Sequence, residues 1–260
     1  MIESTDLVLS VRPSEPKIKS TALVLCENAI MAAKTTRAEN RATMEARIRR
    51  LGREHLSTHG AAGLSLRAIA RDLGVVSSAV YRYVPSRDDL LTALVVEAYS
   101  DLADTVERAV TEHDPDRPHD RLFAACRTMR AWAVADPPRW ALLYGSPVPG
   151  YAAPAEQTVG PGTRVIAMVI GELARAESAG LLTPRARPVP VELSDDFGAI
   201  RTEFGSTISD DALLVATALW STTIGAIGLE VFGQYGPDTF SAPELLFDAQ
   251  IAGALADVDR

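Results

Sequence analysis

Residues 65 to 90 read Ser-Leu-Arg-Ala-Ile-Ala-Arg-Asp-Leu-Gly-Val-Val-Ser-Ser-Ala-Val-Tyr-Arg-Tyr-Val-Pro-Ser-Arg-Asp-Asp-Leu. Behind Ser65, which can cap a helix, apolar residues recur at helical spacing from Leu66 to Leu73. Gly74 can adopt the positive φ that ends one helix and redirects the chain. The stretch therefore predicts two short helices folded about Gly74, which is the pattern of a helix-turn-helix motif.

The second of these helices has one apolar face and one small, polar face. It should begin near Val76 or Ser77 and run to about Tyr83. Val76, Val80 and Val84 share one face and are expected to be buried. Small side chains on the other face would let the helix approach base edges in the major groove of DNA. The residues expected to face bases are Ser77, Ser78, Ala79 and Tyr81.

A third helix should follow at once. Pro85 disfavours a helical conformation at Val84, and Ser86 with Asp89 forms a Ser-x-x-Asp capping box. Apolar residues then recur at helical spacing from Asp89 to Val110. We predict that this long helix connects the DNA-reading head to the rest of the chain.

Residues 60 to 91 resemble the DNA-binding domain of the tetracycline-repressor (TetR) family of bacterial transcriptional regulators. The matching elements are a helix ending at Gly60, the Leu-Arg-Ala-Ile-Ala stretch at 66 to 70, Leu73-Gly74-Val75, Tyr81-Arg82-Tyr83, and Arg87 before Asp88-Asp89-Leu90-Leu91. The resemblance implies an effector pocket in the body of the protein. We expect a homodimer that binds a palindromic operator in double-stranded DNA as a repressor and releases it when a small, largely apolar effector binds. Phosphates are expected to be held by Ser65, Arg67, Tyr83 and Arg87.

This chain departs from the family pattern at four positions. Val76 stands where a capping Ser or Thr is usual, so the cap is predicted to move to Ser77. Val84 replaces the usual aromatic residue. The preceding helix carries Gly52 and His55 in place of Ala and an apolar residue, which predicts looser packing of that helix.

Charge is unevenly distributed along the chain. The formal net charge is −8, yet residues 31 to 90 hold 11 Lys and Arg against 6 Asp and Glu. Residues 91 to 260 hold 12 basic against 24 acidic residues. A basic head on an acidic body would orient the molecule head-first on DNA. Six arginines would be available to the first helix and an N-terminal arm, although for any one of them a solvated helix face is the better interpretation: Arg37, Arg41, Arg47, Arg49, Arg50 and Arg53.

The pattern as a whole predicts an all-α protein: an N-terminal three-helix helix-turn-helix DNA-binding domain plus a larger helical ligand-binding and dimerisation domain. The expected divisions are a disordered extension over 1–38, the DNA-binding domain over 39–87 and the effector and dimerisation domain over 88–260. Body helices are predicted over 121–135, 136–144, 163–179, 212–229 and 243–256, with Pro-rich loops between several of them.

Residues 212–229 contain no charge and are long enough to suggest a membrane span. Acidic residues at both ends and the lack of a basic flank disfavour that interpretation. A helix that is apolar all round is better explained by burial against its own core and against a partner, with no membrane. The expected dimer interface is Gly225, Gly228, Leu229, Phe232, Leu246 and Phe247.

Aromatic and methionine side chains could line a cavity for the effector. The candidates are Met129, Trp132, Trp140, Tyr144, Met168 and Trp220. For any single one of them, ordinary core packing is the favoured alternative. The sequence shows no polar cluster that would identify the ligand.

Other functional classes find little support. With only Cys26 and Cys126, neither a disulfide framework nor a metal site is expected, and a reduced cytoplasm fits best. No Gly-x-Ser-x-Gly elbow or phosphate loop is present, so we expect neither an enzyme nor a cofactor. A helical small-molecule-binding protein or enzyme without a DNA role remains the alternative, with His113 and His119 as its titratable groups. An activator, or a DNA binder without an effector, is a third possibility.

Overall fold

The computed structural model describes residues 21–183 and 189–258, with side chains from residue 36 onward. The chain divides into two units, residues 1–46 and 47–260, and each is described by itself. The expected all-α fold class is confirmed: in the described residues, the only β pairing is an isolated bridge between Leu182 and Val258. The elements are α1 (Thr21–His59), η1 (Ala61–Gly63), α2 (Leu66–Asp72), α3 (Ser77–Tyr81), α4 (Arg87–Thr111), α5 (Pro118–Ala135), α6 (Pro137–Tyr144), α7 (Ala155–Ser178), η2 (Val191–Leu193), α8 (Ser194–Phe204), α9 (Asp210–Val231) and α10 (Pro243–Ala254).

The first unit contains the N-terminal part of α1. The helix begins at Thr21, so residues 21–38 of the expected disordered extension are helical in the structure, and residues 1–20 lie outside the described chain. Between Thr21 and Gly52 the sequence has neither Gly nor Pro, and it is rich in Ala, Arg and Glu, which favour helix. This composition accounts for the helical conformation of the segment.

In the second unit, α2 and α3 form the predicted helix-turn-helix. Ser65 caps α2 by accepting a hydrogen bond from the amide of Ala68 at 3.4 Å, and Gly74 has a φ of 70°. The N-cap of α3 is Val76, not the expected Ser77, and no side chain caps this helix. Val80 and Val84 are buried as predicted, whereas Val76 is 71% exposed, because the N-cap side chain points away from the buried face.

The junction between head and body is built on α4. The Ser86 hydroxyl accepts from the Asp89 amide at 3.0 Å and donates to its carboxylate at 2.7 Å, which confirms the capping box. A Cβ placed on Gly52 of α1 would lie 3.1 Å from Leu94 Cδ1 of α4. The looser packing expected at this glycine is therefore wrong: the missing side chain permits close approach of α1 and α4.

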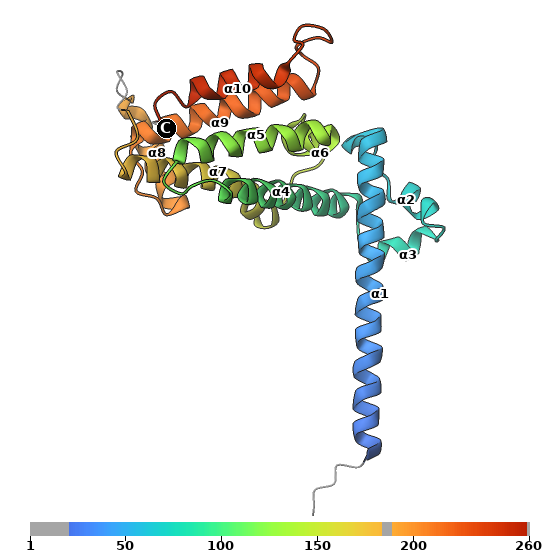
Figure 1. The fold of residues 1–260 in the computed structure, drawn as a ribbon. Coiled ribbons are helices and arrows are strands. Elements are labelled where there is room, and N and C mark those ends of the chain that lie inside the picture. The colour runs from blue at the N-terminus through green and yellow to red at the C-terminus, as the bar shows by residue number, and fades with distance from the viewer. Residues whose placement is uncertain (1–20, 184–188, 259–260) are drawn as a thin grey trace, which may run out of the picture. The chain divides into compact units, whose positions relative to one another are not determined.

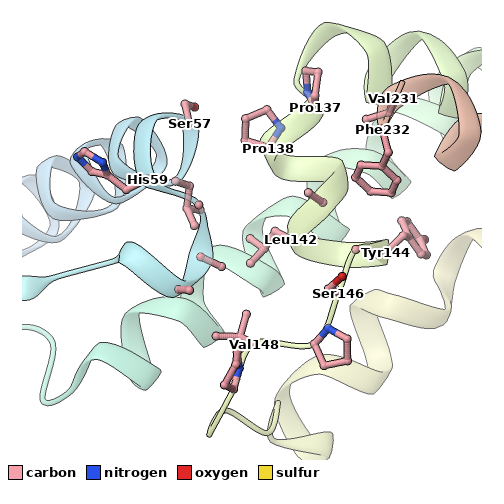
Figure 2. Close-up of a pocket in the computed structure, with 18 of the residues that line it drawn as sticks. Ser57, His59, Pro137, Pro138, Leu142, Tyr144, Ser146, Val148, Val231 and Phe232 are labelled. Atoms are coloured by element: carbon pink, nitrogen blue, oxygen red, sulfur yellow. The ribbon is translucent and has the colours of Figure 1, made fainter. Parts of the chain in front are cut away.

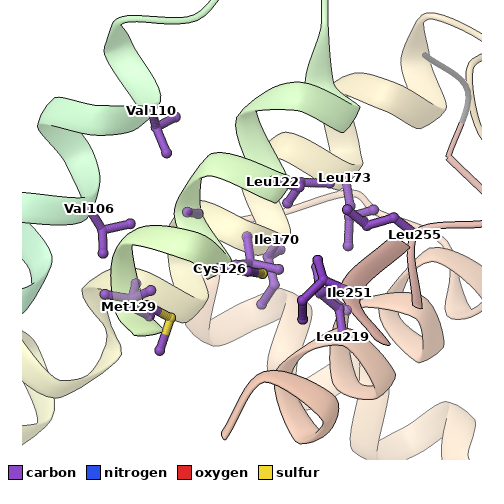
Figure 3. Close-up of a cluster of buried hydrophobic side chains, with 14 of the residues drawn as sticks. Val106, Val110, Leu122, Cys126, Met129, Ile170, Leu173, Leu219, Ile251 and Leu255 are labelled. Atoms are coloured by element: carbon purple, nitrogen blue, oxygen red, sulfur yellow. The ribbon is translucent and has the colours of Figure 1, made fainter. Parts of the chain in front are cut away.

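The body is a layered helical bundle. Helix α4 packs against α5 and α7, and α9 packs against α10, α7 and α5 (Figure 1). Between these helices lies one apolar core, part of which is drawn in Figure 3, with side chains from α4, α5, α7, α9 and α10 converging. Cys126 lies inside it, where burial raises the pKa of the thiol to about 11 although the Thr223 hydroxyl donates to its sulfur at 3.3 Å. Other buried residues of this core include Val106, Val110, Leu122, Ile170, Leu173, Leu219 and Ile251.

Two body helices differ from the sequence prediction. Helix α7 begins at Ala155, eight residues before the expected start at 163, and contains Pro161. A proline inside a helix removes one amide donor, so the sequence around Pro161 predicts a loop. Helix α8 was not predicted at all, although Asp195 and Asp196 in its first turn and Gly205 at its end, with a φ of 59°, are typical helix boundaries.

A buried ion pair joins three helices. The Arg121 guanidinium of α5 forms a two-pronged contact with the Glu172 carboxylate of α7, both at 3.0 Å. The same guanidinium donates to the carbonyls of Val110 in the last turn of α4 and of His113 just after the helix, at 2.9 and 3.0 Å. Arg121 and Glu172 are 7% and 3% exposed. The C-terminal end of α4 is thus fixed to α5 and α7 by a charge that has little access to water.

Helix α9 is the one helix among the described residues that is long and apolar enough to cross a membrane. One side of it is buried in the core, through Ala212, Leu213, Val215 and Leu219 among others. Glu230 near its end is paired with Arg130 of α5 at 2.6 Å. Packing inside the bundle accounts for the apolar composition of that side, and this single helix does not indicate a membrane protein.

Candidate nucleic-acid interface and effector cavity

The outer face of α3 gathers the residues predicted to face bases. Ser78 and Tyr81 are exposed, Tyr81 by 44%, while Ser77 and Ala79 are half-buried. Val80 anchors the helix from beneath, with 1% of its surface exposed. The face is small at its start and ends in an aromatic side chain, which suits entry into a major groove.

The residues predicted to contact phosphates differ in their exposure. Arg67 is exposed at the start of α2, and Ser65 and Tyr83 are half-buried. The Ser65 hydroxyl already accepts a capping bond, so only its proton is available to a phosphate. These three residues stay candidates, with Arg67 the most accessible.

Arg87 has a structural role that the sequence interpretation missed. Its Nε donates to the Leu64 carbonyl at 3.2 Å, and its Nη2 donates to the carbonyls of Ala61 and Ala62 at 2.9 and 3.3 Å. Nη1 bonds to Asp88 at 3.2 Å. Most donors of Arg87 are therefore used to fasten η1 to the start of α4, and the phosphate contact expected of this residue stays a prediction.

A second contact within the head was also missed by the sequence prediction. His55 Nε2 of α1 lies 2.7 Å from a carboxylate oxygen of Asp72 at the end of α2, and the histidine side chain is only 11% exposed. The other ring nitrogen, Nδ1, is buried without a hydrogen-bond partner. This pair holds the first two helices of the head together, a role that only the folded arrangement makes visible.

Several arginines of α1 are engaged with neighbouring acids. Arg53 and Arg49 both contact Glu97 of α4, the latter at 3.6 Å, and Arg50 pairs with Glu54 at 2.5 Å. These arginines belong to the set that was expected to be available to DNA. Their pairing favours the interpretation of a solvated helix face for at least part of that set.

A cavity of about 920 Å³ in the second unit lies between head and body (Figure 2). Its head wall is the stretch 56–62 at the end of α1 and in η1. Its body wall is α6 with the following segment, together with the end of α9. Most of the lining is apolar, and four prolines give it a stiff edge: Pro137, Pro138, Pro147 and Pro149.

Of the six residues predicted for an effector pocket, only Tyr144 lines this cavity. Met129, Trp132 and Trp140 are core residues, 1%, 9% and 0% exposed, so the alternative of ordinary core packing holds for them. Met168 and Trp220 are half-buried and pack against the same core. The prediction missed the cavity because its walls come from the head and from the loop after α6, which are adjacent only in the fold.

Behind Tyr144 lies a cluster of aromatic rings. The Tyr144 ring centroid is 4.4 Å from that of Trp140, 6.1 Å from that of Tyr99 and 6.3 Å from that of Trp220. Burial raises the pKa of the Tyr144 hydroxyl, so it stays protonated at neutral pH and can donate a hydrogen bond. Trp140 Nε1 is buried and has no hydrogen-bond partner in the described part of the chain.

The residues predicted for a dimer interface fall into two groups. Gly225, Leu229 and Phe232 are exposed on α9 and just after it, and Gly228 and Leu246 are half-buried. Phe247, in contrast, is 2% exposed inside the subunit's own core, so it is not available to a partner. The α10 residue that projects outward instead is Leu245, with 64% of its surface exposed.

This head, with a capped first helix, a glycine turn and a small-residue second helix, defines a helix-turn-helix DNA-binding protein. Two family models match the chain: "Bacterial regulatory proteins, tetR family" over residues 48–94 and "Tetracyclin repressor-like, C-terminal domain" over residues 122–254. The HTH-type transcriptional regulator Rv1816 of Mycobacterium tuberculosis is 52% identical over 214 residues, covering 82% of this chain and 92% of the relative. The chain belongs to the TetR family of bacterial transcriptional regulators, and its relatives are regulators, not enzymes.

Solved structures agree with this assignment. The solved structure of the regulatory protein SCO4313 is 30% identical in sequence, with a TM-score of 0.69. The match covers 84% of this chain and 98% of the SCO4313 chain. A bacterial regulatory protein of the tetR family from Rhodococcus RHA1 has a TM-score of 0.56 at 19% identity, covering 83% of this chain and 96% of its own. The second likeness supports the fold alone.

Proposed function

We propose that this regulator is a cytoplasmic, homodimeric repressor that binds a palindromic operator through α3 and releases it when a small, largely apolar effector binds. The observation that carries the effector half of the proposal is the cavity shared by head and body. A ligand that contacts both walls has different contacts whenever the head moves relative to the body. Such a ligand can therefore favour one head position over another, which is the thermodynamic requirement for release.

The head wall of this cavity is coupled directly to the helix that carries the head. Ala61 and Ala62 line the cavity, and their carbonyls accept hydrogen bonds from Arg87 in the first turn of α4. The far end of α4 is fixed by Arg121 in the body. A ligand that displaces η1 would thus act on the N-terminal end of a helix whose other end is held.

The lining suggests the chemical class of the effector. Apolar residues dominate, and the polar groups within reach are few: Ser57, His59, Tyr144, Ser146 and Gln234. A compact apolar molecule with one or two hydrogen-bonding groups would match this surface. The expected donor to such a molecule is the Tyr144 hydroxyl, which burial keeps protonated.

Dimerisation is proposed through the outer faces of α9 and α10. The α9 sequence between Asp211 and Glu230 carries no charge, and its outward residues are small or apolar. Two heads related by a twofold axis would read two half-sites, whereas one short α3 contacts too few bases to be selective.

The test is a mobility-shift titration of the purified protein on its own upstream intergenic DNA between 50 and 200 mM salt. A protein with 6–10 phosphate contacts should lose about 10³- to 10⁵-fold in affinity over this range. Tyr81→Ala should weaken binding about tenfold, while Val191→Ala, at a still more exposed apolar residue of the body, should not change it. Saturable binding indifferent to Tyr81→Ala would contradict the assignment of α3 as the reading helix.

The proposal that an effector binds in this cavity needs a separate test. Ala141 lines the cavity, so Ala141→Trp should occupy part of it, leaving operator binding intact while impairing release by compounds recovered from an apolar library. Ala124→Trp on α5, outside this cavity, is the matched control. Release that survives in the Ala141→Trp protein would place the effector elsewhere, and the smaller cavity of about 350 Å³ that includes Tyr99 and Tyr151 would then be tested.

A further inference from the structure

Val76 is the most exposed large apolar side chain among the described residues of the head. It occupies the N-cap of α3, with φ −68° and ψ 144°, and 71% of its surface is accessible. Isolated surface valines are common and by themselves mean little. The position of this one is informative, because it begins the helix that carries Ser77, Ser78 and Tyr81.

Neither packing nor helix capping accounts for a valine here. The side chain is not buried against the subunit, and α3 has no side-chain cap. Ser, Thr, Asn or Asp at an N-cap would satisfy an amide at the helix start, which valine cannot do. Ser65 and Ser86 perform that role for α2 and α4. Of the three helices of residues 65–111, only the one at the reading face begins with an uncapped, exposed apolar residue.

The chemistry of the major groove offers this side chain one specific partner. Thymine alone among the four bases presents a methyl group there, and apolar side chains recognise it by contact. Valine has no donor or acceptor and so cannot bind a phosphate or a polar base edge. The neighbouring residues of α3 are small, so the helix start can come close to the bases.

We propose that Val76 reads the 5-methyl group of a thymine in each half-site of the operator. The proposal rests on α3 being the reading helix of a dimer, and it names a specificity-determining residue at that site. Burying one methyl-sized group corresponds to about a fourfold change in affinity per half-site. Both half-sites together give about fifteenfold if their contributions add.

The test starts from duplexes selected by the wild-type protein from a random-sequence library. Each thymine of the selected site is then replaced in turn by deoxyuridine, which pairs identically but lacks the 5-methyl group. The wild-type protein should lose about fourfold at one thymine per half-site and change little at the others. Val76→Ala removes both γ-methyl groups and should lose most of the discrimination between the thymine and deoxyuridine duplexes at that position.

Two further variants separate base reading from helix capping. Val76→Ser supplies a cap without a methyl, so it should raise the Tm by about 2–4 °C and abolish the discrimination between thymine and deoxyuridine. Val76→Thr supplies a cap and keeps one methyl, so it should raise the Tm similarly and retain part of the discrimination. A discrimination that follows Tm across these variants would overturn the proposal, because it would reflect helix stability.

The outcomes distinguish this inference from the proposed function. If no duplex is selected, the DNA-reading role itself fails. If duplexes are selected but no thymine is required in either half-site, or every deoxyuridine replacement is neutral, the role of Val76 is refuted while DNA reading stands. If a thymine methyl is required but Val76→Ala retains full discrimination, another residue reads it.

Discussion

At the residue scale, Arg87 shows how a side chain that matches a family pattern can have a structural role that the pattern does not predict. Its position before Asp88 and Asp89 suggested a phosphate contact at the start of a helix. In the folded head its guanidinium instead bonds to three carbonyls of residues 61–64. Sequence spacing gave no sign of this, because the acceptors lie more than twenty residues away along the chain.

Arg87→Ala should therefore act first on stability. It removes charge-assisted hydrogen bonds to part-buried carbonyls, which are worth about 1–3 kcal/mol in total for a partly exposed group, so the urea midpoint should fall. The slope of log affinity against log salt should stay the same, since no phosphate contact is lost.

Arg82→Ala is the matched control for this prediction. Arg82 is exposed beside the reading residues, so its removal should change stability by less than about 0.5 kcal/mol. If Arg82 contacts a phosphate, the salt slope should decrease by about one per contact. A decrease of that size with Arg87→Ala at unchanged stability would restore the phosphate role of Arg87.

At the element scale, a helix boundary could be predicted from the sequence where the contacts that fix it are local. The boundaries of α2, α4 and α6 were predicted because Ser65, Ser86 and Asp136 cap them locally, each hydrogen bonding to an amide three residues ahead. The start of α7 was not predicted, because packing against α4 and α5 keeps a helix intact across Pro161 where local propensity argues for a break. The cavity was missed for the same reason: its walls meet only in the fold.

Among the contacts between helices, the Arg121–Glu172 pair is the one whose loss should lower the stability most. Glu172→Leu leaves Arg121 buried without its counter-charge and should lower the free energy of unfolding by about 3–5 kcal/mol. Arg121→Met combined with Glu172→Leu removes both charges and should recover much of that loss, although the carbonyls of Val110 and His113 then lack their donor.

Urea unfolding of the single and double variants measures this coupling directly. Glu107→Gln, which breaks an exposed contact with Arg164, is the control and should change stability by less than about 1 kcal/mol. Simple additivity of Arg121→Met and Glu172→Leu would show that the two groups do not act as a pair.

At the scale of the whole molecule, the proposed dimer brings two heads to one operator and uses the uncharged outer face of α9 as its contact. Gly225 is exposed on that face, and a Cβ added to it would meet nothing within 4 Å inside the subunit. Gly225→Arg should leave the subunit folded while placing a charge, and a long side chain, between two copies. Light scattering should then give one subunit mass in place of two.

The same variant should weaken DNA binding without touching the head. A lone subunit loses the second, intramolecular binding event, which is commonly worth 10²- to 10⁴-fold, and its salt slope should fall to about half because half of the phosphate contacts remain. Gly171→Arg is the matched control, since Gly171 is also an exposed helical glycine with no neighbour within 4 Å, but on α7. A Gly225→Arg protein that stays dimeric, or a Gly171→Arg protein that dissociates equally, would move the dimer contact away from α9.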